Sequence, residues 1–368
     1  MIPVNEPSIG ERELEYVTEC LRTGWVSSAG HFLDEFENAW AGYCGMPYGV
    51  AVCNGTAALD VAVSCLAVQP GDEVIMPALT IISCALAVVR HGAIPVLVDC
   101  DPETWCMDVS AVKTRLTDRT RAIMAVHMYG HPVDMDPIVD MAREHGLAVI
   151  EDAAEAHGAE YKGRRCGGLG DVSVFSFYAN KVITTGEGGM ILMRDEAQAA
   201  HARAYRNLCF RPERRFYHTE LGQNYRMTNV QAALGLAQLE RIEELISRKR
   251  RTADIYTAGL AAIAGLQLPT EREWARSNYW MYAVVVDPTT ELTGDTFSSA
   301  LRTRGIDTRP FFLGMHEQPA LQRLGLFSGE RYPVSEVVSR QGVYLPSGTA
   351  LTTSQAEEVC AAVREVLR

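Results

Sequence analysis

The sequence predicts a large α/β protein whose core is a mainly parallel sheet. Between Gly49 and Asp152, apolar runs of strand length alternate with stretches of helical length, which is the pattern of repeated βα units. The 368 residues suffice for a large α/β domain and a smaller second one. Polar side chains also follow several of the apolar runs. Because ligands gather at the carboxyl ends of parallel strands, this fold class also predicts where a binding site lies.

Two helices are expected before the first strand. Ser8 and Glu11 have the spacing of a capping box, which predicts a helix that ends at about Thr23. A polar loop over residues 24–30 follows, and a second helix is expected over residues 32–43.

The central part of the chain reads as successive strands and helices. We expect helices from about residue 56, after residue 76, over 109–116 and over 135–145, and strands over 49–53, 73–76, 94–98, 122–127 and 148–152. Two more apolar runs, 172–177 and 190–193, flank a glycine-rich turn and are expected to be buried strands.

A long amphipathic helix, from residue 229 to about 260, is expected to join two domains. We predict a large domain over residues 1–245 and a smaller C-terminal α+β domain over residues 246–368. Within the smaller domain, the pattern predicts strands at 280–286 and 305–309 and helices at 296–304 and 353–367.

The charge pattern argues against binding of nucleic acid. The net charge is −12, and the chain has no basic stripe. Its one basic run, residues 248–251, follows three glutamates and reads as the exposed face of a helix.

Cysteine usage and apolar run length indicate a cytoplasmic protein. The ten cysteines are scattered without a CxxC pair, which favours reduced core cysteines over disulfides or a zinc site. No apolar run approaches about 18 residues, so no membrane span is expected. Residues 1–6 also lack a basic segment followed by an apolar one. We expect no bound metal.

Lys181 is the most unusual of the four lysines. Lys113, Lys162 and Lys249 lie in polar or basic surroundings and are expected on the surface. Lys181 instead follows a buried strand, where a desolvated amine has a lowered pKa and serves as a Schiff-base nucleophile. The alternative is a lysine whose apolar stem is buried while its amine reaches water.

Two further strand ends carry residues that suit a phosphorylated, heterocyclic ligand. Asn54-Gly55-Thr56 opens a helix, where free N–H groups and the helix dipole hold a phosphate, although the same residues also form a common turn. Asp152 ends a buried strand and needs a cationic partner, for which a protonated ring nitrogen is the best candidate. With Lys181, these residues are the parts of a pyridoxal phosphate site.

Five segments resemble the DegT/DnrJ/EryC1/StrS family of nucleotide-sugar aminotransferases: residues 54–59, 127–130, 151–156, 175–189 and 224–229. The resemblance covers essentially the whole chain. It implies a pyridoxal phosphate-dependent transferase of fold type I, similar to aspartate aminotransferase, and a homodimer with active sites at the interface.

The resemblance also implies the roles of individual residues. Lys181 would bind the cofactor, Asp152 would bind the pyridine nitrogen, and Glu155 would lie near the ring. The phosphate would be held by Gly55, Thr56 and Ser176, and by Asn224 of the neighbouring subunit. The chain departs from the family at Ile81, where an aromatic usually stacks on the cofactor ring. This change removes stacking worth about 0.5–1.5 kcal/mol.

The substrate contacts are weaker predictions, each with a structural alternative. Trp25 and Ser27 form either a sugar-facing loop or a surface turn, and His127 and Tyr129 either contact substrate or pack behind the site. Guanidinium groups suit phosphate oxygens, so Arg211, Arg215 and Arg226 are candidates for the diphosphate, with an exposed cluster as the alternative. Arg309 and His316 are candidates from the smaller domain.

The resemblance further implies C4 amination of GDP-4-keto-6-deoxymannose with L-glutamate as the amino donor. A lysine at position 181 indicates amine transfer, because a related branch has histidine there and removes a hydroxyl group. One alternative is the same reaction on a UDP- or dTDP-linked keto-deoxy hexose. An alternative of another class is a non-catalytic regulator that keeps the fold and senses a ligand.

Overall fold

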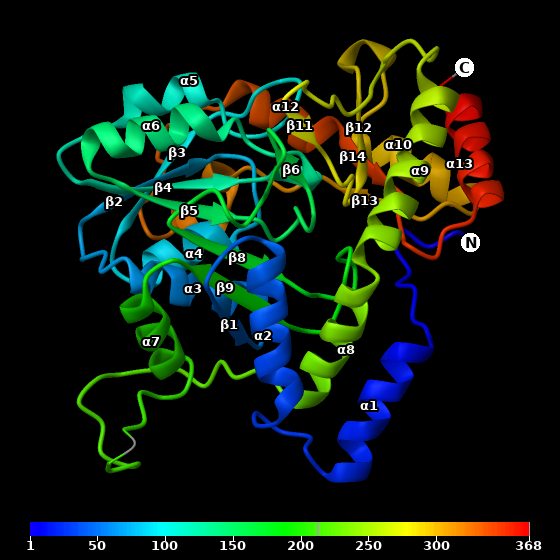
Figure 1. Cartoon of the computed structure of the whole chain (residues 1–368). Helices are drawn as coiled ribbons and strands as arrows, with labels where there is room; N and C mark the ends of the chain where they lie inside the picture. The colour runs from blue at the N-terminus through cyan, green and yellow to red at the C-terminus, as the bar shows by residue number, and fades with distance from the viewer. Residues whose placement is uncertain (212, 368) are drawn as a thin grey trace.

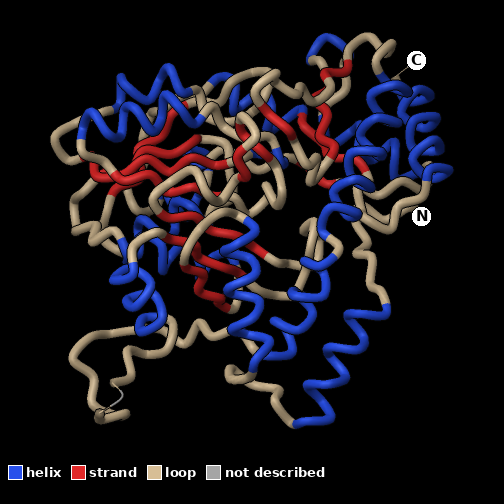
Figure 2. Tube along the Cα trace, in the orientation of Figure 1, coloured by secondary structure: helices blue, strands red, loops and turns tan. Residues whose placement is uncertain are grey.

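A seven-stranded sheet flanked by helices forms the centre of the protein (Figures 1 and 2). The computed structural model describes residues 1–211 and 213–367. The strand order is β1-β9-β8-β5-β4-β2-β3, and β9 runs antiparallel to both of its neighbours while β2–β3, β2–β4, β4–β5 and β5–β8 are parallel pairs. The prediction of a mainly parallel sheet is confirmed. The strands are β1 (Tyr48–Val52), β2 (Glu73–Pro77), β3 (Ile94–Val98), β4 (Thr120–Val126), β5 (Ala148–Asp152), β8 (Val172–Ser176) and β9 (Gly189–Met193).

Both faces of this sheet are buried, which explains why its strands are apolar throughout. Along β9, Met190 and Leu192 belong to one core cluster, whereas Ile191 and Met193 belong to a second. Helices α2 and α6 pack in the first cluster and α3, α4 and α7 in the second. The helices of this part are α1 (Glu11–Thr23), α2 (His31–Tyr43), α3 (Gly55–Cys65), α4 (Ser83–Arg90), α5 (Val109–Val112), α6 (Met135–His145), α7 (Glu196–Tyr205) and α8 (Asn229–Glu240).

Two predicted helix boundaries are wrong. The first helix begins at Glu11 after Gly10, whose N–H donates to the Glu13 carboxylate at 3.1 Å. Ser8 does not cap this helix, because its N–H donates to the Thr349 hydroxyl at 3.0 Å. The helix expected over residues 109–116 ends early, since α5 gives way to a 3₁₀ turn at Lys113–Arg115.

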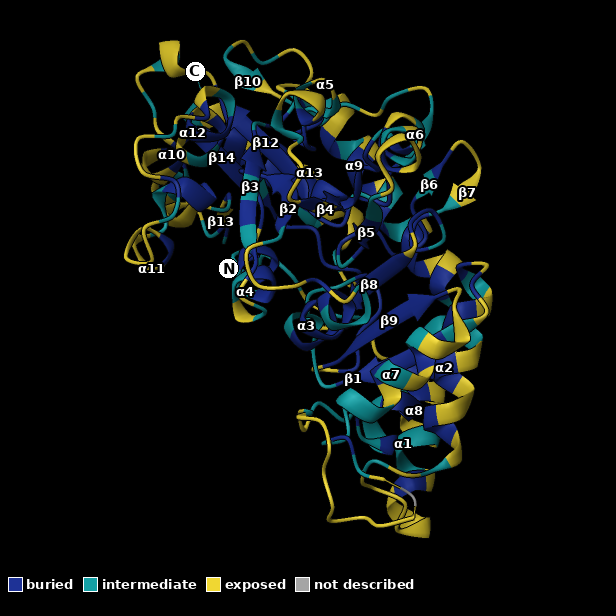
Figure 3. Ribbon diagram, turned by 90° about the vertical axis from the view of Figure 1, so that its left-hand side faces the viewer, coloured by how far each residue is buried: buried dark blue, intermediate teal, exposed yellow. Residues whose placement is uncertain are grey.

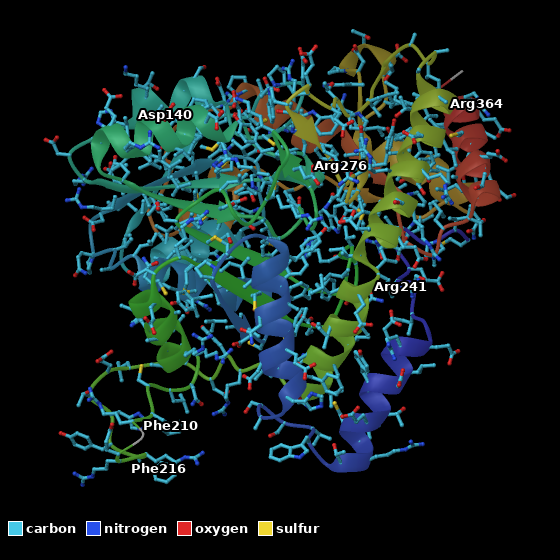
Figure 4. The ribbon with its side chains drawn as sticks, in the orientation of Figure 1. Asp140, Phe210, Phe216, Arg241, Arg276 and Arg364 are labelled. Carbon is cyan, nitrogen blue, oxygen red and sulfur yellow. The ribbon has the colours of Figure 1, made fainter. Side chains whose placement is uncertain are left out.

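The long helix predicted from residue 229 to 260 is two helices, α8 and α9 (Ile242–Leu260). They meet at Arg241, which has non-helical backbone angles and lies at the junction in Figure 4. The prediction that the whole basic run 248–251 is exposed is also wrong, because Lys249 is only 2% exposed.

The C-terminal part is a second layer built on a four-stranded sheet in the order β10-β12-β14-β13. Helices α9, α10 and α13 cover it and form a third core cluster, which also includes Ile2. The strand predicted at 305–309 is reduced to two residues. The elements are β10 (Leu266–Gln267), β12 (Tyr282–Val286), β13 (Arg309–Pro310), β14 (Gly342–Leu345), α10 (Gly294–Thr303), α11 (Pro319–Gln322), α12 (Pro333–Gln341) and α13 (Thr353–Val366).

The two layers share elements across the proposed domain boundary. Met315, Leu321 and Phe327 pack in the second cluster of the central sheet. A small sheet joins β6 (Glu160–Tyr161) and β7 (Arg164–Arg165) to β11 (Ala275–Arg276). The division of the chain at residue 245 stays a prediction.

The loop between α7 and α8 extends away from the body of the molecule and is largely exposed (Figures 1 and 3). Phe216 is 82% exposed and Leu221 90%. The cysteines of the chain are free, and all are buried except the half-buried Cys53 and Cys65, which confirms the expectation of core cysteines. No described helix has the length and apolar character needed to cross a membrane.

A glycine in β9 allows the sheet to approach the start of α3. A Cβ atom on Gly189 would collide with the backbone carbonyl of Asn54, which cannot move without shifting the helix start. We expect Gly189→Ala to lower the free energy of unfolding by about 1–3 kcal/mol in urea titrations, because overpacking displaces backbone.

Gly42→Ala is the matched control. Gly42 lies in α2, and nothing approaches within 4 Å of an added Cβ atom. Alanine should leave stability unchanged or raise it by up to about 1 kcal/mol. Equal effects of the two substitutions would contradict the close approach inferred at Gly189.

Candidate active site

A cavity of about 440 Å³ opens beside the carboxyl ends of the central strands. Loops that follow β1, β2, β5 and β8 supply most of its wall, and aromatic residues of the C-terminal part supply the rest. The lining residues are Asn54, Gly55, Thr56, Leu59, Thr80, Ile81, Ser83, Val126, Asp152, Ala154, Glu155, Ser176, Tyr178, Asn180, Lys181, Glu187, Trp280, Phe312 and Tyr344.

One end of the cavity is built for an anion. The Asn54 side chain caps α3 by accepting the N–H of Ala57 at 2.8 Å. The N–H groups of Gly55 and Thr56 stay at the helix start without an intrahelical acceptor. The Thr56 hydroxyl lies 2.8 Å from that of Ser83. A Cβ atom on Gly55 would lie 2.8 Å from Cβ of Ser176, so glycine is needed to keep the Ser176 hydroxyl beside the helix start.

Asp152 provides a buried carboxylate at the end of β5. Its Oδ1 accepts the N–H of Ala154 at 3.1 Å, and its Oδ2 accepts the Cys84 thiol at 3.2 Å. Burial raises the pKa of Asp152, whereas these donors and the Lys181 amine oppose the rise. A thiol is a weak donor, so the carboxylate keeps capacity for a stronger, cationic partner.

Lys181 lies in the turn between β8 and β9 with its side chain 10% exposed. Its Nζ is 3.9 Å from Oε1 of Glu155 and 3.7 Å from the ring centroid of Trp280. Burial lowers the pKa of Lys181, and the charges of Glu155 and Asp152 oppose this effect. The amine therefore lies in the cavity wall and does not extend into bulk water.

Glu155 connects Lys181 to the turn that follows β4. Its Oε2 accepts the backbone N–H of Tyr129 at 2.7 Å, and Tyr129 has a positive φ of 50°. Burial raises the pKa of Glu155, and the nearby Lys181 charge opposes the rise. The carboxyl group is thus held where it can exchange a proton with the Lys181 amine through a small movement.

The donor set fits pyridoxal phosphate. A helix start with three nearby hydroxyls suits a phosphate ester. A buried carboxylate on the same wall suits a protonated pyridine nitrogen, and a desolvated amine suits a carbonyl carbon. Ile81 also lines this cavity and is 43% exposed, so it reaches the mouth without adding an aromatic face.

His127 and Tyr129 do not line the cavity. His127 is fully buried, with Nε2 2.9 Å from Oε1 of Glu151 and Nδ1 accepting the N–H of Val133 at 3.0 Å. Since both ring nitrogens are engaged, the structure favours packing over the predicted substrate contact. Tyr129 is also buried, and its ring stacks beside that of Trp280 with a centroid separation of 6.1 Å.

His127, Glu151 and Cys166 have donor atoms within 4.8 Å of one another, which is ligand-like spacing. The Glu151 carboxylate is nevertheless occupied, because it accepts the N–H groups of Leu169 at 2.9 Å and Gly170 at 3.1 Å. We interpret this cluster as support for the turn at residues 167–170.

The remaining predicted substrate residues lie outside the cavity, and so does Asn224, which was predicted to bind the cofactor phosphate. Trp25 and Ser27 are exposed, as is Asn224. Arg309 is paired with Asp307 at 2.8 Å, and the buried His316 lies 3.2 Å from Glu336. Within the described chain, these residues are not brought together with Lys181.

Two of the three predicted arginines meet elsewhere. Arg215 and Arg226 line a separate hollow of about 340 Å³ together with Arg203 and Arg206. Arg203 and Arg206 share one buried acid, Glu37. Arg211 is not in this lining and lies 3.8 Å from Glu220 on the extended loop.

The aromatic wall formed by Trp280, Phe312 and Tyr344 was not predicted as part of the site. Trp280 precedes β12, Phe312 follows β13 and Tyr344 lies within β14, and nothing local marks them as cavity residues. Ser83 had a detectable signal, because a hydroxyl at the first position of a helix after a strand end is a common anion donor.

Comparison with known proteins agrees with this geometry. The model of the DegT/DnrJ/EryC1/StrS aminotransferase family matches residues 7–364. The GDP-perosamine synthase of Caulobacter vibrioides is 44% identical over 367 residues, which cover 100% of this chain and 98% of that protein.

Solved structures show the same fold. The aminotransferase TlmJ from Streptoalloteichus hindustanus superposes with a TM-score of 0.92 at 33% identity, over 100% of this chain and 99% of that one. The putative sugar aminotransferase Spr1654 from Streptococcus pneumoniae, in its PLP form, superposes with a TM-score of 0.91 at 26% identity, over 100% of each chain. The chain therefore belongs to the DegT/DnrJ/EryC1/StrS aminotransferase family.

Proposed function

We propose that this chain is a pyridoxal phosphate-dependent aminotransferase that converts GDP-4-keto-6-deoxymannose to GDP-perosamine with L-glutamate as the amino donor. The observation that carries the chemistry is the desolvated Lys181 amine, which lies beside Glu155 in a cavity with an anion-binding end. The choice of sugar is supported by the similarity to a GDP-perosamine synthase over the whole chain.

The residues of the cavity would hold the cofactor by both ends. Gly55, Thr56 and Ser176, which line the cavity, would bind the phosphate, and Asp152 in the same lining would place a negative charge beside the ring nitrogen. Bound pyridoxal phosphate supplies an electron sink that stabilises negative charge on the carbon next to the reacting nitrogen. Burial of Asp152 strengthens its attraction for a positive ring nitrogen, because little water screens it.

Lys181 would move the proton that amine transfer requires. Its lowered pKa favours the neutral amine, which can take a proton from one carbon and return it to another. Such a positioned acid–base group contributes about 10²–10⁴ in rate. Glu155 lies close enough to stabilise the ammonium form while Lys181 carries the proton.

The substrate would enter past the aromatic wall. Trp280, Phe312 and Tyr344 exclude water from the reacting end of the cavity. A sugar diphosphate needs a local cationic patch in a protein of net charge −12. The hollow lined by Arg215 and Arg226 offers one.

We further propose a cytoplasmic homodimer whose sites lie at the interface. Trp25, Phe216 and Leu221 are 57%, 82% and 90% exposed, and a partner subunit would cover such apolar side chains. In that arrangement, Asn224 and the arginine-lined hollow would approach the cavity of the partner subunit. Free cysteines throughout the chain suit a reducing compartment.

Trapping with borohydride tests the role of Lys181. The purified holoprotein should absorb visible light, and reduction should fix the mass of the cofactor on the peptide that contains Lys181. Lys181→Ala should abolish the trapped adduct, whereas Lys162→Ala, at an exposed lysine paired with Asp136, should not. An adduct on Lys162, or none in the wild-type protein, would contradict the proposal.

The identity of the amino donor is tested by the reaction of the holoprotein with L-glutamate in the absence of the sugar substrate. Addition of L-glutamate to the holoprotein should bleach the visible band and release 2-oxoglutarate at one equivalent per site. Lys181→Ala, reconstituted with cofactor, should slow this step by at least about 10²-fold, because the proton carrier is lost. Failure of every amino acid to bleach the wild-type band would favour a ligand sensor over an enzyme.

The sugar is tested with a panel of GDP-, UDP- and dTDP-linked 4-keto-6-deoxy hexoses. The GDP-linked sugar should have the highest kcat/KM, by at least about tenfold or roughly 1.4 kcal/mol, because polar groups built for guanine stay unpaired with other bases. A preference of this size for a UDP or dTDP sugar would overturn the substrate assignment and leave the aminotransferase assignment intact.

A further inference from the structure

Lys249 is a buried lysine, and no carboxylate in the described part of the chain forms an ion pair with it. It is 2% exposed, and its Nζ donates to the backbone carbonyls of Trp280, at 2.8 Å, and Ser347. Among the described residues, the charged group that most affects Lys249 is Lys181, which is itself a base. Burial of an unpaired charge is costly, so a lysine at this position calls for a functional explanation.

The helix phase explains how Lys249 reaches the interior. Leu245, Ile246 and Ala253 are buried on the same face of α9, at spacings of three and four residues from Lys249. Its neighbours Arg248 and Arg250 flank that face and remain partly exposed. The amine therefore points from α9 toward the strand ends of the C-terminal sheet, where Trp280 and Ser347 lie.

Trp280 links Lys249 to Lys181. Its carbonyl accepts Lys249, its backbone N–H donates to Oδ1 of Asn278 at 2.8 Å, and its indole N–H donates to the carbonyl of Asn180 at 2.8 Å. Its ring lies 3.7 Å from Nζ of Lys181. Trp280 is thus held by two backbone hydrogen bonds and one indole hydrogen bond, and the indole bonds to the residue directly before Lys181.

We propose that Lys249 is a positioning residue for Lys181: it fixes Trp280 against the Lys181 amine and places a second basic group behind that amine. This role rests on the proposed function of Lys181 as the cofactor-binding residue. It adds a residue outside the cavity, on a helix of the second layer, to the groups that control the reacting amine.

The groups around Lys181 fall on two sides. The charges of Glu155 and Asp152 stabilise its ammonium form, whereas a charge on Lys249 opposes it. Burial lowers the pKa of His157 to about 3, so this ring is neutral near pH 7. Burial, followed by the effect of Lys181, lowers the pKa of Lys249 to about 7. Lys249 therefore gains charge as the pH falls through 7, and this charge disfavours a second ammonium group at Lys181.

The first test compares Lys249→Gln and Lys249→Met with Lys162→Gln as holoproteins. The visible band of the bound cofactor is titrated with pH, because it reports the proton on the nitrogen that Lys181 contributes. Both Lys249 variants should move the midpoint to higher pH, with at least about a threefold change in the proton-binding constant for loss of one nearby charge. Lys162→Gln, at an exposed lysine, should not move it.

The two Lys249 variants separate charge from geometry. Glutamine keeps N–H donors for the two carbonyls without a charge, whereas methionine keeps only the length. The fall in kcat should therefore be smaller in Lys249→Gln than in Lys249→Met. An unmoved midpoint in both variants, with the wild-type band present, overturns the inference and leaves the proposed function standing. Absence of the band in the wild-type protein would contradict both this inference and the proposed function.

The pH dependence of stability gives a second readout that does not involve the cofactor. With a folded pKa of about 7 and an unfolded pKa near the usual 10.5, only the unfolded chain binds this proton between these values. Stability from Lys249 therefore rises with pH through this window and is constant below it. Relative to Lys249→Met, the unfolding equilibrium constant of the wild type should fall by up to about tenfold per pH unit above pH 7. A pH-independent difference would show that Lys249 is charged throughout and would overturn the inference.

Discussion

Desolvation of the Lys181 amine is the constraint on which the rest of the structure depends. An amine removed from water loses its preference for the charged form, and the surrounding groups then set how readily it takes a proton. The fold meets this constraint with the charges of Glu155 and Asp152 and with the indole ring of Trp280, all close to the amine. The turn that carries Lys181 is held between two strands that pair along their full length, so the amine has little freedom to move back into water.

The parallel sheet gathers the residues of the cavity from distant parts of the chain. Asn54, Asp152 and Ser176 follow or end different strands, yet they meet on one wall because parallel strands end at the same edge. Strand β9 differs from these parallel strands, because it runs antiparallel to β8 and directly follows the turn that carries Lys181. The C-terminal part then closes the cavity with Trp280, Phe312 and Tyr344. The central sheet thus contributes the polar and charged groups of the cavity, and the second layer contributes the aromatic side chains that keep water out.

Strand ends could be predicted from the sequence, whereas contacts between layers could not. Asp152 and Lys181 were identifiable because apolar runs stop at or near them, and these runs are strands in the structure. Lys249 was misplaced because a run of like charges indicates exposure, while its position on the buried face of α9 depends on helix phase. His127 follows a strand end as a ligand residue would, but Glu151 and the Val133 N–H engage its ring. Such pairings between segments leave no local pattern.

Helix α9 belongs to two cores at once. Leu245 and Ile246 pack in the cluster under the central sheet, whereas Tyr256 and Leu260 pack in the cluster of the C-terminal layer. Because the single helix α9 contributes side chains to both clusters, loss of packing in one layer also removes buried contacts from the other layer. The two layers therefore form a single cooperative unit.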